Sequence, residues 1–245
     1  MLKNHLKHEN LKIWRYIDFT KYVDFLNSKS LFFSRADKFQ DPYEGRLSPF
    51  FEKSIRDIVY KGVDSKARED IVATLDKFRE NTYINCWSIS NKQSAALWNF
   101  YGNTETCIAI QSNLNKFENS FINENNYIIH IDKTKYIDKP DKNFKNNFKG
   151  PHSLFIYKRS SFYFETELRA IIQDFTIENK SKNLFKPKHE LGVHIKMDLD
   201  KLVDNIYVSP LAKGWYYNLV KSITTKFGHN FKIIQSDLYK SPELF

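Results

Sequence analysis

The order of the apolar segments constrains the fold of this chain more than any other feature of its 245 residues. Short segments rich in β-branched and aromatic residues, typical of strands, outnumber the segments with helical spacing and do not alternate with them one for one. This order favours an α+β fold with a central, mostly antiparallel sheet flanked by helices. We expect strands at 13–16, 31–34, 82–88, 107–111, 127–137, 162–173, 192–199, 206–208 and 231–236, and helices at 19–26, 54–60, 65–79, 90–100 and 211–227.

Nothing in the sequence divides the chain, so residues 1–245 are interpreted as a single domain. There is no internal repeat, and the 7 Gly and 7 Pro residues form no linker. No stretch approaches the roughly 18 apolar residues of a membrane span. The N-terminus is polar, and there are only two cysteines, Cys86 and Cys107. We therefore expect a cytoplasmic protein without a membrane partner, in which the thiols stay reduced.

Positive charge is concentrated in two lysine-rich segments. The formal net charge is +9, with six lysines between Lys133 and Lys149 and four between Lys180 and Lys188. Such segments attract phosphate groups, which makes nucleic acid a predicted partner. The alternatives are that they are solvated loops, or that the partner is a protein.

The segment from Phe162 to Ile172 carries the most informative pattern. If it is a strand, its side chains alternate between two faces, and Glu165, Glu167 and Arg169 share one of them with Tyr163. Carboxylates two residues apart lie roughly 6–7 Å from each other along a strand. This closeness raises the pKa of one acid or requires a cation, and Arg169 is beside them. The alternative is an exposed strand face with cross-strand ion pairs.

Other candidate binding residues come from earlier segments. Arg15 lies between two aromatic residues on an apolar strand. It is predicted either to bind a phosphate or carboxylate group or to pair with a buried acid. Ser88 ends the strand at 82–88. Trp98 and Tyr101 follow on the next helix, either as core residues or as a stacking platform.

A turn precedes these segments. Asp-Pro followed by Gly is turn chemistry, and residues 40–45 are expected to form a fixed loop. Asp41 is predicted either to lock this loop by accepting backbone N–H bonds, or to border a pocket together with Glu44.

Five motifs follow one another in an order that resembles an uncharacterised bacterial domain family. Its members share a phenylalanine, an Asp-Pro-aromatic-Glu turn, a Cys-aromatic-Ser strand, a tryptophan-bearing helix and a Glu-x-Glu-x-Arg strand. The matching segments run from Phe39 to Glu44, from Cys86 to Ser88, from Leu97 to Trp98, from Tyr101 to Gly102 and from Glu165 to Arg169. The resemblance extends from about Trp14 to Ser236. Such proteins are often met in phage defence and toxin–antitoxin systems, and the resemblance implies a role of that kind.

The chain is also distantly similar to ADP-ribosyltransferases. These combine an aromatic-flanked Arg or His on the first strand, a Ser or Tyr on a later strand, and a Glu, often as Glu-x-Glu, far downstream. Arg15, Ser88 and Glu167 occur here in that order. The similarity implies a split-sheet ADP-ribosyltransferase-like fold, with NAD as a substrate and no metal. It departs from the family pattern at Ser88, which follows Cys-Trp where many such enzymes have Ser-Thr-Ser.

The same similarity implies a role for each residue. Arg15 would bind the diphosphate or ribose of NAD, and Ser88 the nicotinamide ribose. Glu167 would stabilise the oxocarbenium-like transition state, and Glu165 would orient the acceptor, a nucleic acid or a protein.

Two other functions remain open. The four acids Asp41, Glu44, Glu165 and Glu167 would converge on Mg²⁺ in a metal-dependent nuclease. A non-catalytic nucleic-acid-binding or antitoxin-type module would instead use the lysine-rich segments, and its binding would fall steeply with salt.

Overall fold

A mixed sheet of ten strands forms the centre of the molecule. The structure is a computed structural model that describes residues 1–6, 10–45, 76–101, 105–122, 127–138, 150–174 and 188–241. The strands of this sheet are β1 (Leu2–Asn4), β2 (Lys12–Ile17), β3 (Ser30–Arg35), β4 (Thr82–Ile89), β5 (Ile108–Asn113), β6 (Ile129–Lys133), β9 (Glu167–Gln173), β10 (Gly192–Lys196), β11 (Asn205–Val208) and β12 (Ile233–Gln235). A separate two-stranded sheet contains β7 (Lys135–Tyr136) and β8 (Tyr157–Lys158).

The strand order is β1-β6-β9-β4-β2-β5-β11-β12, and β3 joins β10 to β4 beside this path. Seven of the nine strand pairs described in this sheet are antiparallel. The predicted α+β class with a mostly antiparallel sheet is therefore confirmed.

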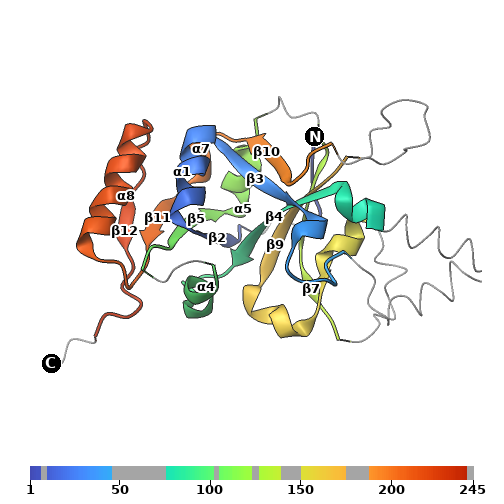
Figure 1. Cartoon of the computed structure of the whole chain (residues 1–245), viewed down its shortest axis with the longest axis horizontal. Coiled ribbons are helices and arrows are strands. Elements are labelled where there is room, and N and C mark those ends of the chain that lie inside the picture. The colour runs from blue at the N-terminus through green and yellow to red at the C-terminus, as the bar shows by residue number, and fades with distance from the viewer. Residues whose placement is uncertain are drawn as a thin grey trace, which may run out of the picture.

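Helices cover both faces of this sheet (Figure 1). They are α1 (Phe19–Ser28), α4 (Ala95–Phe100), α5 (Leu114–Asn119), α7 (Leu199–Leu202) and α8 (Gly214–Lys226), with the 3₁₀ turns η1 (Ala36–Lys38), η2 (Pro151–Ile156) and η3 (Ser160–Glu165). The largest apolar cluster joins the sheet to α1, α5, α7 and α8. Two smaller clusters join it to α4 and to η2. No helix in the described segments is long and apolar enough to span a membrane.

The sheet opens between β2 and β4. These strands pair only at Ile13 with Ile89 and at Trp14 with Ser88. Beyond Trp14, β2 continues along β5 for its whole length, whereas β4 continues along β9 and β3. The two strands therefore diverge, and the backbone leaves room for side chains between the two halves of the sheet.

Local side-chain hydrogen bonds fix the helix starts. Asp18 caps α1 by accepting the backbone N–H of Lys21 at 2.8 Å. The helix expected from residue 90 starts later, because α4 begins after Ser94, whose hydroxyl accepts the N–H of Leu97. Ser90 instead closes a turn with Lys92.

Two predicted strands are broken in the structure. The strand expected at 127–137 divides into β6 and β7. The strand expected at 162–173 is wrong in its first half, which forms η3; β9 begins only at Glu167. Thr166, between them, takes a left-handed conformation with φ of 42°. This conformation turns the chain, so Tyr163 and Glu165 do not continue the face of β9 that holds Glu167 and Arg169.

Several expectations fall on residues outside the described ranges. They are the helix at 54–60, most of the helix at 65–79, and most of both lysine-rich segments, of which Lys133, Lys135 and Lys188 are described. Residues 76–80 are helical, as expected.

Candidate functional site

A pocket with a volume of about 830 Å³ lies where β2 and β4 diverge. Its walls come from β2, β4, η3, α4 and the loop that follows η1. Seven of the nine residues predicted for the site line it: Arg15, Asp41, Glu44, Ser88, Tyr101, Glu165 and Glu167. Residues as far apart in sequence as Arg15 and Glu167 thus contribute to one surface.

Strand register brings three of the pocket residues into one row. Trp14 lies opposite Ser88 in the β2–β4 pair, and Ser88 lies opposite Glu167 in the β4–β9 pair. Residues directly opposite each other in an antiparallel pair point to the same face. Arg15 follows at the point where the strands part, and its Nη1 donates to the carbonyl oxygen of Cys86 at 2.7 Å.

Arg169 lies beneath this row and is fully buried. Its Nε donates to Oε2 of Glu167 at 2.7 Å, and its Nη2 donates to Oε2 of Glu44 at 3.1 Å. Nη1 donates to the carbonyl oxygen of Phe155 at 2.6 Å. Arg169 does not line the pocket; it holds two pocket acids from behind.

Lys158, on β8, is the second cation of the site. It forms an ion pair with Glu165, and its Nζ lies 3.5 Å from Oε1 of Glu167. Two cations, Lys158 and Arg169, therefore serve three buried carboxylates, those of Glu44, Glu165 and Glu167. One carboxylate in excess favours retention of a proton.

The excess proton belongs to Glu165. Burial raises the pKa of Glu165 to about 7, and the negative charge of Glu167 adds to this effect. For Glu167, burial also acts to raise the pKa, but Arg169 and Lys158 outweigh it and hold the pKa below its ordinary value. The two acids thus differ in protonation near neutral pH.

Hydrogen bonds on both sides hold Thr166, the residue in the left-handed conformation between Glu165 and Glu167. The Thr166 hydroxyl donates to the carbonyl oxygen of Ile89 at 3.0 Å and lies 3.2 Å from the Ser88 hydroxyl oxygen. The N–H of Ile89 donates to the Thr166 carbonyl oxygen at 2.8 Å. The N–H of Glu167 donates to the Tyr136 hydroxyl at 2.9 Å. These bonds fix the turn that directs both acids toward one place.

Arg15 is a cation of the pocket without an acidic partner among the described residues. In the described part of the chain its guanidinium forms no ion pair with a carboxylate, and its one hydrogen bond is to a backbone oxygen. Burial lowers the pKa of Arg15. A desolvated guanidinium facing a pocket is well suited to bind a phosphate or carboxylate group.

The loop from Asp41 to Glu44 is both a structural lock and a pocket border. Asp41 accepts the N–H of Tyr43 at 3.0 Å and pairs with Arg159 at 2.9 Å. Gly45, with φ of 64°, ends the loop against Phe155, whose ring would lie 2.1 Å from a Cβ at this position. Both expectations for Asp41 therefore hold at once.

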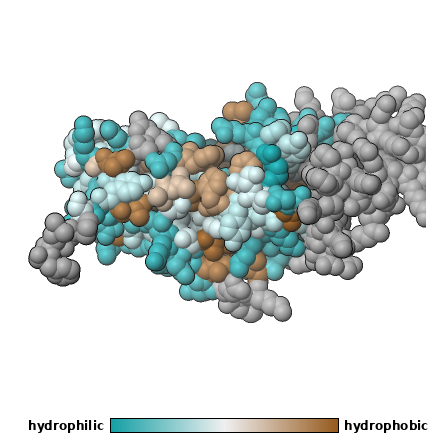
Figure 2. All heavy atoms as spheres, turned by 90° about the horizontal axis from the view of Figure 1, so that it is seen from below, coloured by the Kyte–Doolittle hydropathy of each residue, from teal (hydrophilic) through white to brown (hydrophobic). Residues whose placement is uncertain are grey.

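Aromatic side chains surround the mouth of the pocket. Phe100 and Tyr101, at the end of α4, line it and remain 52% and 38% exposed. The ring of Phe164 lies 5.8 Å from that of Phe100. Figure 2 looks at the molecule from the side on which α4 lies, and apolar residues gather near the middle of this face. Such rings can stack on a planar ligand group.

Trp98 does not line the pocket. It is 1% exposed and packs in the cluster with Trp14 and Tyr16 behind α4, and its indole N–H donates to Gln93. It supports the wall and is not retained as a binding residue.

Lys158 and Tyr136 could not be predicted from the sequence, because each lies in a two-residue strand without a motif around it. Cys86 lines the pocket, but burial raises its pKa, so its thiol stays protonated.

The acids of the pocket already have cationic partners. Asp41 pairs with Arg159, Glu44 and Glu167 with Arg169, and Glu165 with Lys158. A divalent metal would have to displace these side chains, so the arrangement disfavours the convergent Mg²⁺ site of a nuclease. Comparisons with protein-family models, curated proteins and solved structures give no match.

Proposed function

We propose that this protein is an NAD-dependent ADP-ribosyltransferase-like enzyme that uses the pocket between β2 and β4. The observation that carries the proposal is the row formed by Ser88 and Glu167, with Glu165 beside it and Arg15 at the opening of the sheet. An ionised acid, an acid with a pKa near 7 and a cation available to an anion occupy one pocket.

Each end of NAD has a counterpart in the pocket. Arg15 binds the diphosphate, and the exposed faces of Phe100 and Tyr101 accept a planar base by stacking. The Ser88 hydroxyl binds the nicotinamide ribose. The volume of about 830 Å³ lies within the range of about 300–1,000 Å³ typical of ligand pockets.

The reaction breaks the bond between C1′ of the ribose and the nicotinamide nitrogen. Nicotinamide leaves with the bonding electron pair, and positive charge develops on the ribose ring. The carboxylate of Glu167, ionised at neutral pH, stabilises this charge and accepts a hydrogen bond from a ribose hydroxyl. Arg169 and Lys158 fix the position of this carboxylate, and their positive charges offset part of its negative charge.

Glu165 acts on the acceptor. An acceptor oxygen or nitrogen bonds to C1′, and its proton passes to the carboxylate of Glu165. A base with a pKa of about 7 is half ionised at neutral pH, which suits proton transfer under these conditions.

The acceptor class follows from the basic charge of the chain. With a net charge of +9, the protein favours an anionic acceptor, and we propose a nucleic acid ahead of a protein. We propose that the protein acts in the cytoplasm, where NAD is available and thiols stay reduced. Its biological role would be in phage defence or as a toxin.

The test is NAD cleavage by the purified chain, measured as nicotinamide release and as transfer of labelled ADP-ribose to RNA, DNA and protein. Release of nicotinamide also reports transfer to water, so it does not depend on knowing the acceptor. We expect Glu167→Gln to lower the rate about 10²–10³-fold, because it removes the charge that stabilises the transition state.

The matched control is Glu190→Gln, an exposed glutamate that does not line the pocket, and it should retain the wild-type rate. Added Mg²⁺ should not change the rate. Absence of NAD cleavage by the folded wild-type chain with every acceptor, or equal rates for wild type and Glu167→Gln, would overturn the proposal. Salt-sensitive nucleic-acid binding without NAD cleavage would identify the non-catalytic alternative.

A further inference from the structure

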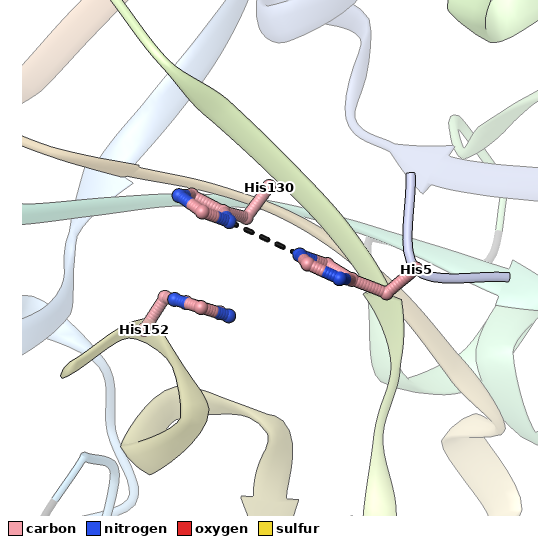
Figure 3. A group of neighbouring side chains, drawn as sticks. All are labelled: His5, His130 and His152. Atoms are coloured by element: carbon pink, nitrogen blue, oxygen red, sulfur yellow. Dashed lines mark hydrogen bonds between the residues drawn. The ribbon is translucent and has the colours of Figure 1, made fainter. Parts of the chain in front are cut away.

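Three histidines from separate parts of the chain lie together in the structure (Figure 3). His5 follows β1, His130 is on β6 and His152 is in η2. One ring nitrogen of each lies within 4.8 Å of the others. Nε2 of His5 and Nδ1 of His130 are 3.1 Å apart, and the rings of His130 and His152 stack at 3.9 Å.

This histidine cluster is separate from the proposed NAD pocket. His130 lies opposite Ile171 on β9, four residues beyond Glu167. At about 3.3 Å per residue this places it roughly 13 Å further along the strand. None of the three histidines lines the pocket.

We propose that His5, His130 and His152 bind a divalent transition-metal cation of the Zn²⁺ class. Imidazole nitrogen is a preferred ligand of Zn²⁺, and three protein ligands with one open position make a common zinc site. At a Zn–N distance of about 2.0–2.1 Å, two tetrahedral ligand nitrogens lie about 3.3 Å apart. The nitrogens of His5 and His130 are already near this separation.

Binding requires a local rearrangement of the rings. A metal must lie in the plane of each imidazole that binds it, whereas these rings are stacked with interplanar angles of 3°, 11° and 15°. The ring of His152 must therefore turn about its side-chain bonds. In the metal-free cluster one of His5 and His130 donates a proton to the other, and the metal replaces this hydrogen bond.

Among the described residues, the charge of Lys3 opposes the cation, because Lys3 lies opposite His130 in the parallel β1–β6 pair. A bound cation would tie the N-terminal segment to β6 and η2. Because η2 also contains Phe155, whose carbonyl oxygen accepts from Arg169, the metal would stabilise the support of the pocket.

The experiment titrates the full chain, stripped of metal by a chelator and dialysed, with Zn²⁺ by calorimetry. We expect one saturable site per chain and a higher melting temperature with Zn²⁺. His5→Phe removes a ligand nitrogen but keeps an aromatic ring in the stack, and it should weaken Zn²⁺ binding at least tenfold. His194→Phe, outside the histidine cluster, is the matched control and should bind as the wild type does.

A second measurement uses Co²⁺ in place of Zn²⁺, because the visible absorption of bound Co²⁺ reports nitrogen ligands directly. The absorption of the wild type should be lost in His5→Phe and kept in His194→Phe. Metal-free melting curves establish that both variants fold. No saturable Zn²⁺ binding by the wild type, or equal binding by the folded His5→Phe variant, overturns the proposal whatever the outcome with NAD.

Discussion

Glu165 and Glu167 differ in protonation although one residue separates them. Glu167 begins β9 and contacts both Arg169 and Lys158, whereas Glu165 ends η3 and shares Lys158 alone. Both carboxylates are buried, so water solvates neither of them well. The number of cations within reach of each acid decides which one keeps its proton, and this is a common way to divide acid and base roles.

The rate of NAD cleavage should rise with pH. If Glu165 accepts the proton of the acceptor, only its ionised form is active, and this form increases as the pH passes the pKa of about 7. We expect the rate to increase between about pH 6 and pH 8 and then to level off, as measured by initial rates of nicotinamide release.

Glu165→Gln supplies the comparison. It should be slower at pH 8 and should lose the rise with pH. A Glu165→Gln variant that keeps the wild-type profile would assign the titration to another group.

At the level of elements, β9 has a different environment from the one expected of a half-exposed strand. Six of its seven residues are buried, on both of its faces, and its polar residues meet buried partners. The β4–β9 pair begins with Thr82 opposite Gln173 and ends with Ser88 opposite Glu167. The sheet thus places a charged network inside the protein, where each ion depends on its partner.

Arg169→Met should destabilise the protein strongly. The change leaves Glu44 and Glu167 buried without the guanidinium that neutralises them, and losing one partner of a buried ion pair costs about 3–5 kcal/mol. Equilibrium unfolding in urea measures the change in the free energy of unfolding.

Arg159→Met is the matched control, because the Arg159 side chain is 44% exposed in its pair with Asp41. It should cost less than about 1 kcal/mol. Equal losses for Arg159→Met and Arg169→Met would contradict the buried-network account.

At the level of the whole molecule, the short contact between β2 and β4 determines where the ligand pocket lies. Each strand has a long partner on its other side, so two well-paired halves meet at only two residue pairs. A ligand in the pocket contacts both halves, and it should stabilise the folded molecule by binding the native state alone.

NAD should therefore raise the melting temperature of the wild-type chain. At a ligand concentration of about 100 times Kd the gain is about 2.7 kcal/mol, a readout that requires no turnover. Arg15→Ala should reduce the shift, because it removes the cation proposed for the diphosphate. Thermal unfolding with and without NAD measures both, and an equal shift for the two proteins would exclude Arg15 from the binding site.

Periodicity alone predicted most of the strands and the class of the fold. β2, β4 and β11 lie where apolar residues and β-branched or aromatic side chains concentrate, because burial on a sheet selects those residues. The short strand β1 was missed, since its polar sequence pairs with β6 without an apolar signature. That Arg15, Ser88 and Glu167 would share a site was implied by the similarity to ADP-ribosyltransferases, and all three line the pocket.

The sequence by itself determined the α+β class, the main strands of the site (β2, β4 and β9) and the residue types available there. Only the tertiary structure decided that Glu165 leaves the strand, that Lys158 joins the acids and that three distant histidines meet. Local patterns record which side chains are buried, but ion pairs and ring contacts depend on strand register and chain reversal. These bring together residues far apart in sequence, as Glu44 and Arg169 are, and no local spacing encodes them.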